Sequence, residues 1–178
     1  MSVWLLAIGA RRMAFLWSVL FCLAMGLAAA NKVAYLAWGG GWQALCYKAL
    51  SGHATGASAV LPVLAFVLAQ GRAKTWQYAA VAGALALAAL LAAALVSTAQ
   101  HSAAEALGGW CTGAAASLAA LRFGGKLPDR QTAQGAWAAA FTLGIGLCIL
   151  QAMPLAYWMV HLARLVAGNT PLFNLHSH

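Results

Sequence analysis

Long apolar segments with almost no acidic residues between them are the feature that most limits how this chain folds. Of its 178 residues, 64% are hydrophobic and 7% are charged, whereas a soluble domain carries about a quarter charged residues. Only two acids stand against ten Lys and Arg. A core of this size in water would lack the polar surface to cover it, so we expect hydrocarbon as the solvent. The sequence therefore predicts an integral membrane protein.

Membrane spans need about 20 mostly apolar residues, and several segments reach or approach that length. These segments are residues 13–30, 51–70, 75–99, 103–121 and 134–153. The first follows two arginines and ends in three alanines, as a cleavable signal peptide does, but we expect a retained helix. We therefore predict an all-α, polytopic transmembrane bundle of five or six spans, forming a single domain over 1–178.

Two further segments are harder to assign. Residues 155–168 follow Pro154, are apolar but short, and carry His161 and Arg164, which favours an interfacial helix or a kinked extension. Together with residues 134–153 they would form a C-terminal helical extension over 134–168. In residues 32–50, three glycines lie between Trp38 and Trp42, which favours a headgroup-level or re-entrant segment.

The basic residues separate into two sets when the spans alternate in direction. One set contains Arg11, Arg12, Arg72, Lys74, Arg122, Lys126 and Arg130, and the other Lys32, Lys48 and Arg164. The larger set is expected in the cytoplasm, because positive loops favour that side. The pattern predicts a bacterial inner-membrane protein with a cytoplasmic N-terminus. It also assigns the net charge of +8 to orientation and anionic headgroups, with no nucleic-acid partner.

Small residues and cysteines are interpreted as packing features. Cys22, Cys46, Cys111 and Cys148 have no CxxC spacing, so we expect small core residues and no disulfide or metal site. Glycines on one segment, Gly108, Gly109 and Gly113, would let two helices approach closely.

Glu105 is an unusual residue, because it lies in the first turn of an otherwise apolar helix, where a carboxylate is costly. His101 precedes it by four residues, so the two side chains can share a helix face and form a hydrogen bond. A carboxylate that holds one imidazole nitrogen raises the basicity of the other. The alternative is a purely structural His–Glu pair at a helix start. The other acid, Asp129, is expected in a solvated loop.

A second polar group opens the segment at residues 51–70. Ser51 is a good N-cap, Gly52 lets an anion approach the backbone, and helix-start amides bind phosphate. By the alternation of spans, His53 and Lys32 share the outer face with His101 and Glu105. A metal site is disfavoured, because the histidines lack short-range ligand spacing. His176 and His178 are expected in a frayed tail.

These segments resemble the motifs of the type 2 phosphatidic acid phosphatase and haloperoxidase superfamily. Residues 50–55, Leu-Ser-Gly-His-Ala-Thr, are similar to its Pro-Ser-Gly-His motif, and residues 101–113 are similar to its third motif, a histidine followed four residues later by an acid. The resemblance covers residues 31–124, which it implies to be a phosphatase-like core. Two arginines of the family pattern are missing: Gly39 and Gly40 stand in place of Arg-Pro after Lys32, and Leu95 stands in place of the other arginine.

The resemblance implies a membrane lipid phosphatase without a cofactor. His101 would attack phosphorus and form a phosphohistidine, Glu105 would hold its ring, and His53 would protonate the leaving oxygen. Lys32, Ser51 and Gly52 would bind the phosphoryl oxygens, with Lys48 or Arg164 as substitute cations. The expected substrate is phosphatidate, phosphatidylglycerophosphate or a polyprenyl diphosphate, at a site facing the periplasm or exterior.

Two other functions compete with this one. A catalytically weakened relative would bind lipid or partner proteins as a membrane subunit, and the small residues on several helices are also compatible with a homo-oligomer or a membrane complex. A transporter would need a polar path across the bilayer, which the spans do not supply. The lipid bilayer is the expected surrounding in every case.

Overall fold

The computed structural model describes residues 1–39, 47–125 and 155–168, and every regular element in these ranges is an α-helix. The helices are α1 (Ser2–Ala7), α2 (Arg11–Trp38), α3 (Gly52–Leu68), α4 (Lys74–Ser97), α5 (Ala103–Phe123) and α7 (Leu155–Ala167). The predicted all-α class is therefore confirmed. The predicted segment 134–153 lies outside the described residues.

Helix α2 is longer than the sequence predicted. It continues through Lys32 to Trp38 as one 28-residue helix and ends at Gly39, whose φ of 68° is left-handed. The interpretation of residues 32–38 as part of a separate headgroup-level or re-entrant segment is therefore wrong. No proline or glycine interrupts the chain between Gly26 and Gly39, so the helix runs until a glycine supplies the terminating conformation.

Side-chain caps fix the starts of α3 and α5. Ser51 is the N-cap of α3, and its hydroxyl accepts a hydrogen bond from the amide of Ala54. Ser102 is the N-cap of α5 and forms a capping box with Glu105. In such a box, each side chain accepts from the other residue's backbone amide, which satisfies donors that have no partner inside the helix. Both helices thus begin within a residue of the predicted position.

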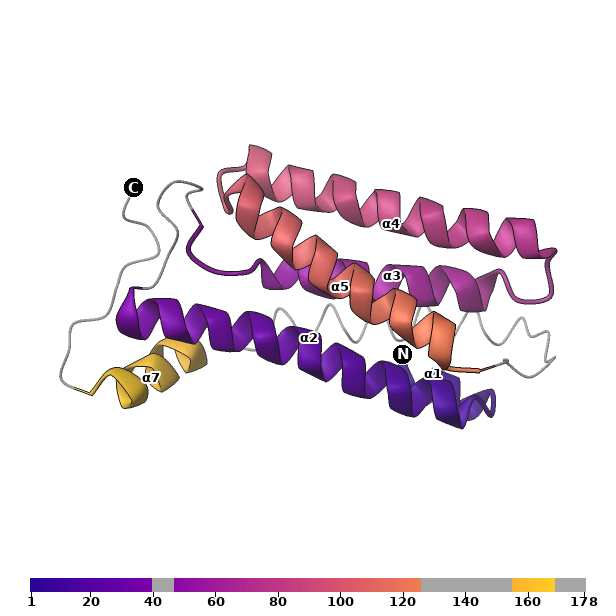
Figure 1. The fold of residues 1–178 in the computed structure, drawn as a ribbon, viewed down its shortest axis with the longest axis horizontal. Helices are drawn as coiled ribbons and strands as arrows, with labels where there is room; N and C mark the ends of the chain where they lie inside the picture. Colours follow the sequence, from indigo (N-terminus) through magenta and orange to yellow (C-terminus); the bar gives the residue numbers. More distant parts are fainter. Residues whose placement is uncertain (40–46, 126–154, 169–178) are drawn as a thin grey trace.

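Four long helices lie side by side in Figure 1, and their contacts fix their directions. The tightest pair, α3 and α5, runs parallel. A Cβ added at Gly109 would meet the carbonyl oxygen of Ser51 at 2.5 Å, and one added at Gly113 would meet Thr55 and Ser58, one turn further along α3. Bare glycine backbones therefore let the two helices approach closely, as the sequence predicted.

Helix α2 runs antiparallel to α3 and α5. Early in α2, the Trp17 indole donates a 3.1 Å hydrogen bond to the carbonyl of Ala59 on α3. Late in α2, the Asn31 side chain reaches Leu50, just before α3 begins. Trp17 also belongs to the larger apolar core cluster, whose other buried members include Leu5, Met13 and Val63. That core lies where α1 and the start of α2 pack against the second half of α3.

Because α2 and α4 run opposite to α3 and α5, one end of the bundle collects five of the eight Lys and Arg side chains that the structure describes. This end holds the start of α2, the α3–α4 turn and the end of α5 (Figure 1). Its exposed basic residues are Arg11, Arg12, Arg72, Lys74 and Arg122. We call it the basic end. Lys126 and Arg130, predicted on the same side, lie outside the described residues.

The described helices include two candidate membrane spans, fewer than the five or six predicted. Among the described helices, α2 and α4 are long and apolar enough to cross a membrane. Helix α3 is apolar but has only 17 residues. Many large apolar side chains nevertheless face outward along the bundle, among them Phe15, Leu23, Leu90 and Leu107. These features weakly indicate membrane association.

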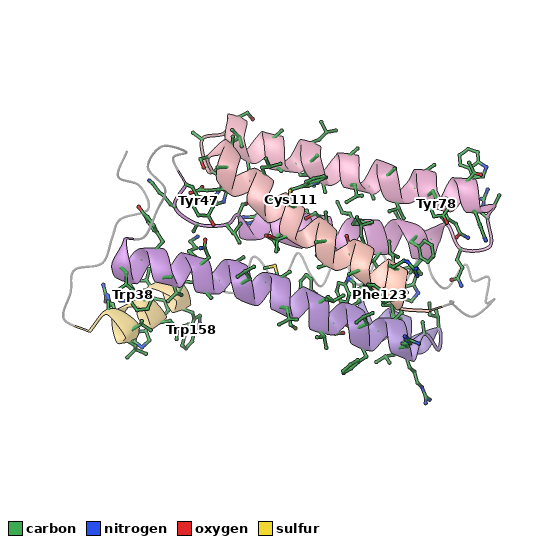
Figure 2. The ribbon with its side chains drawn as sticks, in the orientation of Figure 1. Trp38, Tyr47, Tyr78, Cys111, Phe123 and Trp158 are labelled. Atoms are coloured by element: carbon green, nitrogen blue, oxygen red, sulfur yellow. The ribbon has the colours of Figure 1, made fainter. Side chains whose placement is uncertain are left out.

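The prediction that the cysteines are core residues is wrong for the two that the structure describes. Cys22 on α2 and Cys111 on α5 are both free and exposed, and Figure 2 labels Cys111 on α5. In helices this rich in alanine, a small thiol has no packing advantage that would draw it to the interior. Cys46 and Cys148 lie outside the described residues.

Candidate functional site: the strap and the starts of two helices

A short extended segment, residues 47–51, crosses the beginning of α5 and leads into α3. We call this segment the strap. It lies at the end of the bundle opposite the basic end, where Figure 2 labels Tyr47. Four consecutive strap amides are hydrogen-bonded to other helices. Those of Lys48, Ala49 and Ser51 donate to Glu105 on α5, and that of Leu50 donates to Asn31 on α2.

Glu105 is the centre of this arrangement. Its Oε1 accepts from the amides of Lys48 at 2.8 Å and Ala49 at 3.2 Å. Its Oε2 lies 3.1 Å from the amide of Ser102 and 3.0 Å from Nδ1 of His101. The residue is only 6% exposed. A buried carboxylate is tolerated here because both of its oxygens are occupied by donors.

His101 does bond to Glu105, but the two residues are not neighbours on a helix face, so that part of the prediction is wrong. Helix α5 begins at Ala103, and Ser102 is extended, with ψ of 159°. His101 therefore precedes the N-cap, and the capping geometry turns its ring onto the Glu105 carboxylate. Because a carboxylate oxygen can only accept, Nδ1 carries the proton in this contact, and in the neutral ring the lone pair is on Nε2. The His101 side chain is 18% exposed, so a reactant can reach the ring.

The Ser51-Gly52-His53 sequence lies directly beside the start of α5. The Ser51 amide donates a 3.1 Å hydrogen bond to the carbonyl of Glu105. Ser51 itself is fully buried and its hydroxyl caps α3, so in this conformation its side chain has a structural contact. Gly52 and His53 form the first turn of α3, whose amides have no acceptor within the helix. His53 is exposed.

Asn31 was not singled out from the sequence. Its Oδ1 accepts two hydrogen bonds, one from the amide of Leu50 at 2.9 Å and one from the hydroxyl of Tyr47 at 2.8 Å. An amide N–H can only donate, so the contact with Leu50 fixes which side-chain atom of Asn31 is the oxygen. The one available signal was an asparagine within a long apolar segment, immediately before Lys32.

Tyr47 is half-buried beside these groups. Burial raises the pKa of its hydroxyl, and the negative charge of Glu105 raises it further. Both effects disfavour the phenolate, because a charge loses solvation on burial and is repelled by a like charge. Tyr47 therefore stays a hydrogen-bond donor to Asn31 at neutral pH.

Of the three predicted cations, Lys32 and Lys48 lie near the candidate site, whereas Arg164 lies on a separate helix. Lys32 is half-buried on α2, next to Asn31, and Lys48 belongs to the strap. Both therefore lie at the same end of the bundle as His53 and His101. Arg164 is exposed on α7, which packs against α2 (Figure 1), and it makes none of the contacts described for Glu105 or His101. The described contacts thus do not bring Arg164 to the site.

Three residues considered in the sequence, Asp129, His176 and His178, lie outside the described residues. Within residues 1–39, 47–125 and 155–168, no group of three or more His, Cys, Asp and Glu side chains is arranged to hold a metal ion.

Comparison with known proteins gives one distant relative. The chain is 30% identical over 127 residues to an "Uncharacterized 22.5 kDa protein in cps region" of Klebsiella pneumoniae. The aligned region covers 71% of this chain and 61% of the relative. No family model matches the sequence, and no solved structure matches it. These comparisons assign no activity to the site.

Proposed function

We propose that this chain is a membrane lipid phosphatase that hydrolyses a lipid phosphate or diphosphate at the starts of α3 and α5. The observation that carries the proposal is the double contact of Glu105, whose Oε2 holds His101 while its Oε1 holds the strap that leads to His53. Two histidines 48 residues apart in the sequence are thereby linked to one carboxylate. The combination matches the second and third motifs of the resemblance described above.

The chemistry begins with Nε2 of His101. Its lone pair attacks phosphorus and forms an N–P bond, while the P–O bond to the lipid breaks. His53 in its protonated form gives a proton to the departing oxygen, so the lipid leaves as an alcohol or, from a diphosphate, as a monophosphate. Neutral His53 then takes a proton from water, whose oxygen attacks the phosphohistidine and breaks the N–P bond. Inorganic phosphate leaves and both histidines return to their starting states.

Positive charge must balance the phosphoryl oxygens during this transfer. Lys32 and Lys48 lie at the right end of the bundle, and the first amides of α3 add partial positive charge. Ser51 contributes by capping and orienting that helix start. These groups take the place of the two arginines in the family pattern.

We place the site at the outer face of a bacterial inner membrane. The exposed Arg and Lys of the basic end lie at one end of the bundle, and His53, His101 and the strap lie at the other. This separation supports the proposed orientation, because positive loops favour the cytoplasmic side. The outward-facing apolar side chains support a lipid surrounding for the bundle, within a five- or six-span arrangement. Helix α7 exposes Tyr157 and Trp158, and Trp158 lies near the Trp38 end of α2 (Figure 2). Exposed aromatic side chains of this kind fit an interfacial position.

Cysteine labelling tests this orientation. In a variant with all four native cysteines replaced by serine, Arg72→Cys and Gln100→Cys report on the two ends of the bundle. A membrane-impermeant maleimide added to intact cells should label Gln100→Cys alone, and Arg72→Cys should react only after the membrane is disrupted. Labelling of both from one side would contradict a membrane-crossing α4.

Phosphate release from purified full-length protein tests the activity. The substrates are phosphatidate, phosphatidylglycerophosphate and a polyprenyl diphosphate in mixed micelles. His101→Ala should abolish release and prevent formation of an acid-labile phosphoenzyme, because the nucleophile is gone. His161→Ala makes the same change on an exposed part of α7 and should leave release intact. Equal release by the wild type and His101→Ala would exclude the mechanism.

One observation favours a second function, a catalytically weakened subunit that binds lipid. Leu95, which stands where the family pattern has an arginine, packs against a cluster of Ala54, Ala92 and Ala106. An apolar contact there supplies no charge to a phosphoryl group. Wild-type protein that binds vesicles containing phosphatidate but releases no phosphate from any of the three substrates would support this function.

A further inference from the structure

The strap is attached to two different helices, and only one of the attachments belongs to the motifs considered so far. Glu105 on α5 accepts the amides of Lys48 and Ala49. On the other side, Asn31 on α2 accepts the amide of Leu50 and the hydroxyl of Tyr47 with a single oxygen atom. We propose that Asn31 is a positioning residue of the site, which sets where α3 begins and hence where His53 lies relative to His101.

The chain connectivity explains why this contact matters. Leu50 directly precedes Ser51, the N-cap of α3, and His53 follows two residues later. A hydrogen bond to the Leu50 amide therefore locates the backbone three residues from the His53 ring. The hydroxyl of Tyr47, the first residue of the strap, donates to the same Asn31 oxygen. Tyr47 and Leu50 are therefore held by α2, while Lys48, Ala49 and Ser51 are held by Glu105 on α5.

Both donors in this contact would lose their acceptor if an apolar residue replaced Asn31. The Leu50 amide and the Tyr47 hydroxyl are both in half-buried residues, and a donor that loses its acceptor away from water is destabilised. An apolar residue at position 31 would release this end of the strap from α2 and leave the Glu105 contacts in place. The start of α3 could then shift against α5 without unfolding of the bundle.

The kinetic test of this inference rests on the proposed phosphatase function. A second readout, hydrogen exchange of the strap amides, does not depend on that function. Asn31→Leu removes the acceptor at nearly constant volume, and Asn31→Asp keeps an oxygen at the same place. Gln77→Leu is the matched control, because it makes a similar amide-to-isobutyl change and removes one hydrogen bond, to the Arg72 carbonyl, at the basic end.

Hydrogen exchange of the strap amides is measured first, on the full-length protein in detergent. Asn31→Leu should speed exchange in peptides covering residues 47–53 by roughly 10-fold, the factor expected when a donor loses its partner. Asn31→Asp and Gln77→Leu should leave that exchange at the wild-type rate. Unchanged exchange in Asn31→Leu would overturn the proposal, whether or not the protein is a phosphatase.

The kinetic test follows in the same preparations. Asn31→Leu should lower kcat by roughly 10-fold or more with a much smaller change in KM, because displacement of a proton donor affects the transition state more than substrate binding. Asn31→Asp should restore much of kcat, which a general loss of folded protein would not explain. Full kcat in Asn31→Leu would overturn the positioning role, while an inactive wild type would instead refute the proposed function and leave the exchange result to decide on Asn31.

Discussion

The carboxylate of Glu105 accepts a 2.8 Å hydrogen bond from the amide of Lys48, 57 residues earlier in the chain. The same side chain caps its own helix and holds the His101 ring. The sequence connects Glu105 only with His101, four positions away. In the structure, Glu105 also joins two segments that are distant in the chain. Both carboxylate oxygens of Glu105 accept backbone amides, and Oε2 also holds the His101 ring.

Glu105→Gln should separate its contact with His101 from its contacts with the strap. The amide oxygen can keep the bonds from Lys48 and Ala49, but the NH2 group then faces Nδ1 of His101. To avoid two opposed donors, His101 must move its proton to Nε2, which removes the nucleophilic lone pair. We expect a loss of about 1–3 kcal/mol in the free energy of unfolding and a fall in kcat on the order of 10⁴, as for a wrong imidazole tautomer elsewhere.

Urea unfolding and phosphate release check the two parts of this prediction, and imidazole nitrogen NMR reports the tautomer. His101→Ala provides the comparison, since it should abolish release while removing only one of the four side-chain contacts of Glu105. Wild-type turnover in Glu105→Gln would show that the His101–Glu105 bond has no chemical role.

Gly113→Ala should destabilise the bundle because α5 has no room for a methyl group there. The added Cβ would meet the Thr55 carbonyl and the Ser58 hydroxyl of α3, both fully buried. This steric clash can be relieved only if the packed backbones of α3 and α5 shift, which costs about 1–3 kcal/mol in the free energy of unfolding. Gly83→Ala on α4 is the matched control, since nothing lies within 4 Å of its added Cβ.

Thermal unfolding of both variants in the same detergent measures the difference. Gly83→Ala should be neutral or more stable by up to about 1 kcal/mol, because alanine favours a helix over glycine. Equal loss in the two variants would mean that α3 and α5 are not in close contact.

Tyr47 gives a prediction for alkaline pH. Its pKa is raised in the folded protein by burial and by the charge of Glu105, so the folded state favours the neutral phenol relative to the unfolded chain. The stability that this contributes is complete below the unfolded pKa of about 10 and is lost as pH rises through the higher folded pKa. Strap exchange should therefore accelerate at high pH as the phenolate forms and the donor to Asn31 disappears.

Near-ultraviolet titration of the tyrosines checks this directly. The difference between the wild type and Tyr47→Phe isolates the Tyr47 transition, whose pKa should lie above the ordinary tyrosine value of 10.0. In Tyr47→Phe the pH-dependent part of strap exchange, beyond the intrinsic rise of exchange with pH, should vanish. A Tyr47 pKa at or below the ordinary tyrosine value would contradict the burial of this side chain.

Local sequence signals predicted most of the helices correctly, for identifiable reasons. Ser51, which the sequence identified as a good N-cap, marks the start of α3, because a serine hydroxyl satisfies a helix-start amide wherever the helix lies in the fold. The same cap by Ser102 at the start of α5 was not identified. Gly109 and Gly113 likewise predicted a close approach of this segment to another helix, which the structure identifies as α3. The extension of α2 to Trp38 was missed, because the three glycines and flanking tryptophans were given more weight than the uninterrupted helix formers before them.

The amino-acid sequence by itself determined the all-helical class, the Ser51 cap and the His101–Glu105 pair, since these depend on the length of the apolar segments and on contacts only a few residues apart. Only the tertiary structure decided which helices pack in parallel, that Glu105 reaches the strap, and that Asn31 holds its other side. Those contacts join segments between 16 and 57 residues apart. Their formation depends on how whole helices pack, and no local pattern of residue types encodes which distant amide a carboxylate or an asparagine will meet.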